Sequence, residues 1–431
     1  MKKTSPNSSL FGSFNMRESA QDVAPIYIDV RQAFLCIARG LDLVGIDDVH
    51  HGHRVAYTAY ECAKKMLWSP EKSERAFYSG LLHDCGVSTT SEHKQLLQKM
   101  QPKDVNYHCD RGYEALQSNH LLKSFAPIVR YHHSSDDELE KLDIQQDDKD
   151  IAGLIHLSDR VDFLRSTYVK ADHSEVVMHK HSIIGQLENK QAIFNPLFLE
   201  HMIKTISVDG FWFSMEYENI ERICLNFSHY QPFEQYLHLS ELMDLAHFLA
   251  HIVDSKSSYT FNHSEKVAKL SKELAQDMGM DKESCTQIYI AGLVHDLGKL
   301  RVPDDILYKA DKLTDSETAM IKRHAADTLN ILQQLLPNNP IAAWAGNHHE
   351  KLNGTGYPYH LEGEQLDLGS RIVAIADVFQ ALSQSRPYKS RMKLEDVLSI
   401  LSAMVDKNEL DHHVFEKLMN RKDHYFEIST G

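Results

Sequence analysis

Histidines and aspartates recur in the same order in the two halves of this chain. The C-terminal set comprises His263, His295, Asp296, His324, His348, His349 and Asp377. The N-terminal set comprises His53, His83, Asp84, His108, His132, His133 and Asp159. The offset between counterparts runs from 210 residues (53 to 263) to 218 (159 to 377). Imidazole and carboxylate donors suit Mn, Fe, Ni, Co or Zn better than Mg or Ca, so the pattern predicts a duplicated metal-binding unit.

The His295-Asp296 pair is expected at the end of an apolar helix, GLVHDLGKL, which Gly298 can terminate. A single histidine on such a helix is more often a core residue than a ligand, but seven donor residues that recur in order favour metal binding. Neighbouring side chains on a helix point about 100° apart. Both residues therefore reach one ion only if it lies between them, and a second ion requires Asp296 as a bridge. The other imidazoles must converge from other helices.

Apolar residues at three- and four-residue spacing predict helices in both halves, so the expected fold class is all-α. We expect a disordered tail over 1–20, a first helical domain over 21–236 and a second over 237–431, with the boundary near Gln231-Pro232. These two domains would be tandem copies of one helical architecture.

The composition limits the classes of function. Of the 431 residues, 42% are hydrophobic and 25% charged, which is typical of a soluble globular protein. No apolar run approaches the roughly 20 residues that a membrane span needs, so no membrane association is expected. The six cysteines form no CxxC pair, which favours a reduced, cytoplasmic protein. A net charge of −15 argues against a nucleic acid polymer as partner.

Local motifs in the second half carry a resemblance to a known family. The motifs are YTFNHSEKVA, HDLGKLRVP, HHEKLNGTGYP, ADVFQAL and SRPYK. From Leu242 to Leu401 the chain resembles the HD-GYP phosphodiesterases, which implies two tandem domains of the HD superfamily. The arrangement of a divergent HD domain before an HD-GYP domain is similar to that of the bacterial 3',3'-cyclic GMP-AMP phosphodiesterases.

The resemblance implies a two-metal hydrolase that opens a cyclic dinucleotide to a linear 5'-phosphorylated dinucleotide, 5'-pApG for the mixed substrate. One ion would be held by His263, His295, Asp296 and Asp377, and the other by Asp296, His324, His348 and His349. Asp296 and Lys299 are the implied catalytic residues. The implied substrate contacts are Gly356, Tyr357, Pro358, Arg386 and Lys389. Some family members hold a third metal with a glutamate where this chain has Tyr259, so we expect two divalent ions, Mn, Fe or Ni.

The first half keeps every ligand type but lacks the GYP loop, and Val87 stands at the position of Lys299. It therefore resembles a plain HD domain, for which we expect further metal. Because HD enzymes include nucleotide phosphomonoesterases, we expect it to remove the 5'-phosphate that ring opening generates, as a 5'-nucleotidase. The alternative is a structural or dimerising domain that positions the second domain, and the expected assembly is a homodimer.

Three alternatives remain open at this point. The substrate could be cyclic di-GMP, since the residues alone do not distinguish adenine from guanine. The chain could instead be a signalling module that binds a cyclic dinucleotide, or a diguanylate-cyclase-type protein partner, without turnover. A nucleotide phosphohydrolase that uses only the first domain is the third alternative. The mixed cyclic dinucleotide is favoured because the resemblance extends over the whole chain.

Overall fold

The computed structural model describes residues 28–44, 50–87, 89–90, 92, 96, 106–169, 175–228, 236–256, 262–384 and 391–431. Within these ranges the chain is helical apart from two short strands and an isolated bridge, so the all-α prediction is confirmed. Strand β1 (Ile28–Asp29) pairs antiparallel with β2 (Tyr236–Leu237). The expected N-terminal tail and the Gln231-Pro232 boundary lie outside the described residues, so the domain limits stay predictions.

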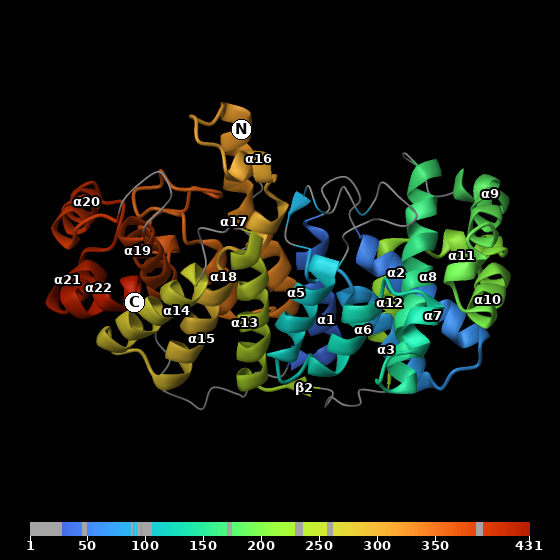
Figure 1. Ribbon diagram of the computed structural model, residues 1–431. Helices are drawn as coiled ribbons and strands as arrows, with labels where there is room; N and C mark the ends of the chain where they lie inside the picture. The colour runs from blue at the N-terminus through green and yellow to red at the C-terminus, as the bar shows by residue number, and fades with distance from the viewer. Residues whose placement is uncertain are drawn as a thin grey trace, which may run out of the picture.

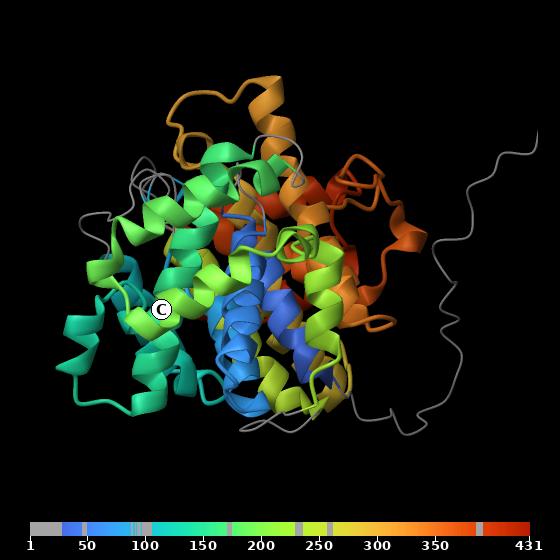
Figure 2. The same ribbon diagram turned by 90° about the vertical axis from the view of Figure 1, so that its right-hand side faces the viewer.

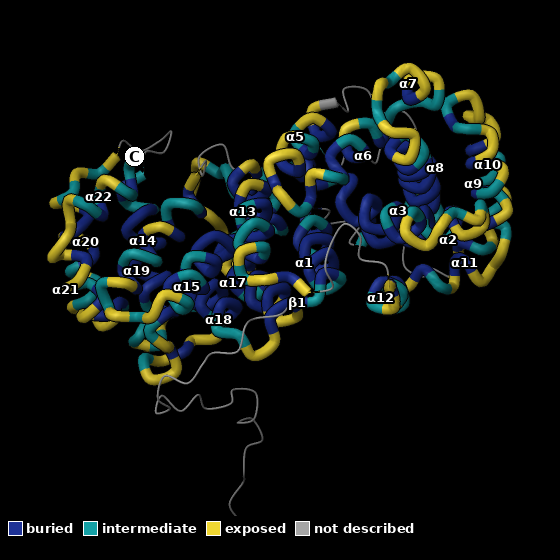
Figure 3. Tube along the Cα trace, turned by 90° about the horizontal axis from the view of Figure 1, so that it is seen from below, coloured by how far each residue is buried: buried dark blue, intermediate teal, exposed yellow. Residues whose placement is uncertain are grey.

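The helices form two lobes that lie side by side (Figure 1). The first lobe contains α1 (Val30–Asp42), α2 (His51–Lys65), α3 (Pro70–Leu82), α5 (Asn106–Gln117), η1 (Lys123–Phe125), α6 (Ala126–Tyr131), α7 (Asp136–Glu140), α8 (Gln146–Tyr168), α9 (Val176–Glu188), η3 (Gln191–Ile193), α10 (Pro196–Ile206), α11 (Asp209–Phe213) and α12 (Tyr217–Leu225). Helix α8 is buried on all sides over most of its length and runs through this lobe as its central element (Figure 3).

The second lobe repeats this plan. It contains α13 (Leu239–Lys256), α14 (His263–Asp277), α15 (Lys282–Val294), η4 (Leu297–Arg301), α16 (Asp304–Leu307), α17 (Asp315–Leu335), α18 (Pro340–Gly346), η5 (Gly363–Gln365), α19 (Leu368–Ser383), α20 (Leu394–Asp406), α21 (His412–Asn420) and α22 (Lys422–Thr430). In sequence order α13, α14, α15, α17 and α19 correspond to α1, α2, α3, α5 and α8.

Local sequence fixes the helix starts near the histidines. The Asp281 carboxylate accepts hydrogen bonds from the first turn of α15, and Thr314 and Glu317 form a capping box at the start of α17. Helix α3 begins with Ser69 as N-cap and Pro70 in the first turn. Proline is tolerated there because N–H groups of the first turn have no acceptor within the helix. These signals set where the ligand-bearing helices begin and end.

One glycine in each lobe allows two of these helices to approach closely. A Cβ added to Gly298 would lie 2.0 Å from the backbone oxygen of His324, and one added to Gly86 would lie 1.9 Å from that of His108. Any larger residue would push α17 or α5 away from the turn that follows the His-Asp pair. The glycine therefore brings the third histidine of each set to the centre.

The two lobes contact each other through equivalent helices. Helix α1 of the first lobe packs against α17 and η4 of the second, and α13 of the second packs against α5 of the first. An apolar pocket between them is lined by Ala33, Cys36 and Ile37 from α1 and by Leu242, Leu245, Ala246 and Leu249 from α13, among others. Viewed along the line of the lobes, the first covers much of the second (Figure 2).

Candidate metal centres

The seven residues of the C-terminal set converge on one buried site. His263 is the first residue of α14, and His295 caps the C-terminus of α15. His324 lies within α17, the His348-His349 pair follows α18, and Asp377 lies within α19. The structure thus brings together residues that are more than one hundred positions apart in the chain.

Asp296 lies between two groups of donors. Its Oδ2 is 3.5 Å from Nε2 of His263 and 3.3 Å from Nε2 of His295. Its Oδ1 is 3.5 Å from Nε2 of His324 and 3.7 Å from Nε2 of His348. Each carboxylate oxygen therefore faces a different set of imidazoles, which is the geometry of a bridging ligand.

These residues fit a pair of metal ions. Oδ1 of Asp296 is buried and has no hydrogen-bond partner among the described residues. Such a group is costly unless an ion or donor satisfies it. The ligand atoms of His263, His295 and Asp296 cluster within 4.8 Å of one another, as do those of His324, His348 and His349. Asp377 Oδ1 completes the first cluster at 3.4 Å from Nε2 of His263.

Hydrogen bonds at the far nitrogen orient the imidazoles. Nδ1 of His295, His324 and His348 lies 2.8, 2.6 and 2.7 Å from the backbone oxygens of Gly292, Ile321 and Ala345. Nδ1 of His263 lies 2.5 Å from Oε1 of Gln380. Because Nδ1 donates outward, the Nε2 atoms face the centre, as second-shell contacts require in metal sites.

The two donor groups differ in protonation. Burial disfavours a charged imidazole, but Asp296 and Asp377 overcome it and raise the pKa of His295 to about 10. Burial, opposed in part by Asp296, lowers the pKa of His324 to about 3, and burial also lowers the pKa of His349 to about 4. The His324 group is therefore neutral and ready to ligate, whereas an ion beside His295 must displace a proton.

The other predicted residues of this domain lie at different distances from the centre. Nζ of Lys299 lies 2.5 Å from Oδ2 of Asp296, so it reaches the donor cluster. The ring of Tyr357 lies 4.7 Å from that of His349, centre to centre, which places it beside the metal ligands. Arg386 and Lys389 lie outside the described residues, as does Tyr259.

The Gly356-Tyr357-Pro358 loop is anchored to the histidine pair by Glu350, which was not predicted as a site residue from the sequence. The buried carboxylate of Glu350 accepts hydrogen bonds from the backbone N–H groups of Tyr359, at 2.6 Å, and Leu361, at 3.0 Å. A Cβ at Gly356 would lie 2.5 Å from Cα of Glu350, so only glycine fits there. Glu350 thus fixes the loop against the ligands.

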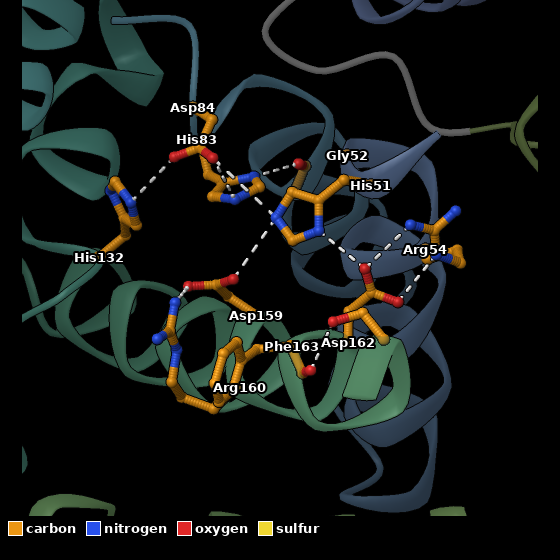
Figure 4. A network of polar contacts seen from close by, with 12 residues as sticks. His51, Gly52, Arg54, His83, Asp84, His132, Asp159, Arg160, Asp162 and Phe163 are labelled. Atoms are coloured by element: carbon orange, nitrogen blue, oxygen red, sulfur yellow. Dashed lines mark hydrogen bonds and ion pairs between the residues drawn. The ribbon is translucent and has the colours of Figure 1, made fainter. Parts of the chain in front are cut away.

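The N-terminal set forms a matching centre, with one correction. His51, and not the predicted His53, provides the first imidazole (Figure 4). Its Nε2 lies 3.4 Å from Oδ1 of Asp159 and 3.9 Å from Oδ2 of Asp84. Figure 4 also shows Nδ1 of His51 directed at Asp162, 2.7 Å away. The other six predicted residues lie at this centre.

His53 lies on another face of α2 because it is two residues further along the helix. Its Nδ1 is 2.7 Å from Oδ2 of Asp42, and its Nε2 is 3.7 Å from Oε1 of Glu221. The sequence held a signal for the right choice, since His51 and His83 share one offset of 212 residues with His263 and His295 (51 to 263, 83 to 295). With three histidines at 50, 51 and 53, the sequence pattern alone does not show which of these side chains points to the centre.

Asp84 bridges the N-terminal donors as Asp296 bridges the others. Its Oδ2 is 3.5 Å from Nε2 of His83, while its Oδ1 is 3.5 Å from Nε2 of His108 and 3.6 Å from Nε2 of His132. His133 completes the set, with Nδ1 at 3.8 Å from Oδ2 of Asp159. Two donor groups therefore flank one carboxylate in this lobe too.

Charged neighbours distinguish the two centres. In the first lobe the buried guanidinium of Arg160 pairs with Asp159 (Figure 4), and the equivalent residue after Asp377 is Val378. In the second lobe Lys299 contacts Asp296, and its counterpart Val87 is apolar and buried. The cationic side chain therefore pairs with Asp159 in the N-terminal centre and with the bridging Asp296 in the C-terminal centre.

Comparisons with known proteins agree with this duplicated arrangement. Family models described as HD domain match residues 49–164 and 247–414. The chain is 43% identical over 408 residues, 94% of each protein, to 3'3'-cGAMP-specific phosphodiesterase 1 of Vibrio cholerae. It is 34% identical over 185 residues, 42% of this chain and 48% of the other, to a cyclic di-GMP phosphodiesterase of Thermotoga maritima.

A solved structure shares the fold. The crystal structure of a cyclic GMP-AMP-specific phosphodiesterase from V. cholerae matches with a TM-score of 0.61 at 20% identity, covering 92% of this chain and 98% of the other. The HD-domain matches in both lobes and the relative that is similar over the whole length define the class. The chain belongs to the HD-domain phosphodiesterases and is an enzyme of that class.

No helix in the described part of the chain is long and apolar enough to cross a membrane.

Proposed function

We propose that the C-terminal centre hydrolyses 3',3'-cyclic GMP-AMP to the linear dinucleotide 5'-pApG. The observation that carries this proposal is the placement of Asp296, with one carboxylate oxygen facing each of two imidazole groups. Two divalent transition ions held there would activate water and stabilise the charge that develops on the phosphoryl oxygens. The whole-length similarity to the V. cholerae enzyme named for this substrate supports the choice of bases.

The residues around the ions have separate roles in this proposal. The Lys299 ammonium, which contacts Asp296, would stabilise negative charge on the phosphate or on the departing 3' oxygen. Tyr357 beside His349 offers an aromatic face on which a nucleobase can stack. Arg386 and Lys389, together with Gly356 and Pro358, remain predicted substrate contacts.

We further propose that the N-terminal centre removes the 5'-phosphate of the linear product. Its support is the complete donor set around Asp84, now with His51 in place of His53. A scaffold without bound metal has no physical need for buried imidazoles that face one carboxylate. A purely structural or dimerising lobe is the alternative.

The test separates the two activities. The purified protein and its Asp84→Asn and Asp296→Asn variants are incubated with manganese and each cyclic dinucleotide, and the products are resolved by chromatography. We expect Asp296→Asn to lose ring opening, and Asp84→Asn to open the ring but release no phosphate. Full phosphate release by Asp84→Asn would contradict the role of the first lobe.

Cyclic di-GMP is the second candidate substrate, because the similar T. maritima protein carries that name. The same incubation decides between the two, since the cyclic dinucleotide that is consumed identifies the bases. Binding without turnover of any of them would favour a signalling module. A diguanylate-cyclase-type partner and a homodimer remain predictions.

A further inference from the structure

Cys109 places a thiol in the N-terminal centre. It follows His108 in α5, is 3% exposed, and its Sγ lies 3.5 Å from Nε2 of His108 and 3.8 Å from Nδ1 of His132. The equivalent residue after His324 is Ala325, so no thiol takes this place in the C-terminal centre. Sulfur therefore distinguishes the two donor sets.

A second observation points to a ligand at the same place. Nε2 of His133 is buried without a hydrogen-bond partner among the described residues, and the side chain is only 8% exposed. Ligand atoms of His108, Cys109, His132 and His133 all lie within 4.8 Å of one another. Buried polar atoms that converge in this way need an ion to satisfy them.

We propose that His108, Cys109, His132 and His133 form a zinc site with three imidazoles and one thiolate. Around a tetrahedral zinc ion, two nitrogens lie about 3.4 Å apart and a nitrogen and a sulfur about 3.6 Å apart, from Zn–N and Zn–S distances of about 2.1 and 2.3 Å. The structure has 3.4 Å between Nε2 of His108 and Nε2 of His132, and 3.5 Å between Sγ of Cys109 and Nε2 of His108. These two pairs match the spacing around a tetrahedral zinc ion, and the ligand atoms of all four residues lie within 4.8 Å of one another.

The thiolate makes this position different in kind from its C-terminal counterpart. Thiolate ligands select zinc over manganese, whereas imidazole and carboxylate donors accept both more evenly. Four protein ligands fill a tetrahedral zinc site, as in structural zinc sites. The water for phosphate removal in this lobe would therefore be held at the other donor position, beside His51, His83, Asp84 and Asp159. Binding releases the thiol proton to solvent and forms one Zn–S bond. The inference does not depend on which cyclic dinucleotide the C-terminal centre cleaves.

X-ray absorption at the zinc edge tests the site without any substitution. The full chain is stripped with a chelator and loaded with one equivalent of zinc. We expect one sulfur neighbour at about 2.3 Å with nitrogen neighbours at about 2.0 Å. A shell of nitrogen and oxygen only would overturn the proposal.

Cobalt(II) titration identifies which cysteine supplies the sulfur. We expect the wild type to develop a thiolate-to-cobalt charge-transfer band, and Cys109→Ala and Cys109→Ser to lose it. Alanine is the natural residue at the twin position, Ala325, so the fold accommodates it. Cys62→Ser is the matched control, because that thiol is buried in α2 with Sγ 4.0 Å from the Phe198 carbonyl oxygen.

Zinc affinity gives an independent measurement. In competition with a zinc indicator, Cys109→Ala should bind zinc more than about 10-fold more weakly than the wild type. Loss of a partner outside the ligand shell already costs about that much, and loss of a direct ligand should cost at least the same. Cys62→Ser should bind zinc as the wild type does. A band that persists in Cys109→Ser, or unchanged zinc affinity in both Cys109 variants, would refute the assignment.

Discussion

The two centres share a frame and differ in what surrounds it. Both place a bridging aspartate after a helix that ends at a histidine, and both bring in a third histidine beside a glycine that allows close approach. The C-terminal centre adds Lys299 at the bridge, whereas the N-terminal centre adds Arg160 at the last aspartate and Cys109 beside the third histidine. One fold therefore presents the same primary donors in two electrostatic settings.

This difference shows where the functional divergence of a duplicated site resides. The shared donors are tied to helix ends and cannot move without loss of the centre. Lys299 and Arg160 contact the ligands from outside, and the residues at their twin positions, Val87 and Val378, are uncharged. The charge beside the ligands can therefore differ while the helices stay in place. Both cations are paired with an aspartate, but the Lys299 side chain is 26% exposed and that of Arg160 only 2%. We therefore interpret Lys299 as the cation that can also reach a substrate.

The largest effect is expected from a substitution that removes the bridging carboxylate. Asp296→Asn should reduce opening of the cyclic dinucleotide by more than about 10³-fold, because both ions depend on this carboxylate and together provide several kcal/mol of transition-state stabilisation. Asp84→Asn should leave ring opening near the wild-type rate. Steady-state assays of both variants make the comparison, and equal losses would show that the centres are not independent.

Removal of the cation at the bridge should have the next largest effect. Lys299→Met should lower kcat by about 10²–10³-fold, as loss of one donor to a developing oxyanion does, while bound metal stays unchanged. Lys309→Met is the control, since that lysine pairs with Glu317 instead. Metal analysis alongside the kinetics checks the result, and loss of metal in Lys299→Met would assign it a structural part.

The outer partner of the first histidine offers a smaller test. Gln380→Leu removes the acceptor that faces Nδ1 of His263 and should weaken metal binding at the C-terminal centre by about 10–100-fold. Gln380→Glu keeps an acceptor and imitates Asp162, which faces His51 in the other lobe, so it should recover most of the affinity. Titration with metal buffers measures both, and equal affinities would show that this contact is unimportant.

The smallest effect is expected from a substitution that makes the N-terminal centre more similar to the C-terminal one. Arg160→Val introduces the residue found at position 378 and frees Asp159 from its ion pair. Manganese should then bind the first lobe about tenfold more tightly, because a charge-assisted hydrogen bond contributes about 1.5–3 kcal/mol and no longer competes. Calorimetry measures this affinity, with Arg130→Val as control because Arg130 is an exposed arginine of α6 that pairs with Asp110. Unchanged affinity would mean that Arg160 does not oppose the ion.

Much of the C-terminal centre could be predicted from the sequence, and less of the N-terminal one. All seven C-terminal ligand candidates could be named from the sequence because no other histidine competes with them at their positions in the repeat. In the first lobe His50, His51 and His53 compete for one position, and the backbone at the start of α2 decides among them. His50 has a left-handed backbone, with φ of 71°, as Asn262 has before α14, with φ of 63°. This shared turn directs the next residue, His51 or His263, at the centre.

The sequence by itself determined the donor types, the helical periodicity and the duplication, because these depend on residue identity and local spacing. Only the tertiary structure decided which oxygen of Asp296 faces which imidazoles. It also decided that Arg160 forms an ion pair with Asp159 and that the Cys109 thiol lies beside His108 and His132. Such contacts depend on how closely helices from distant parts of the chain approach, to within a few tenths of an ångström. That approach is set by packing at residues such as Gly86 and Gly298, and no local pattern records it.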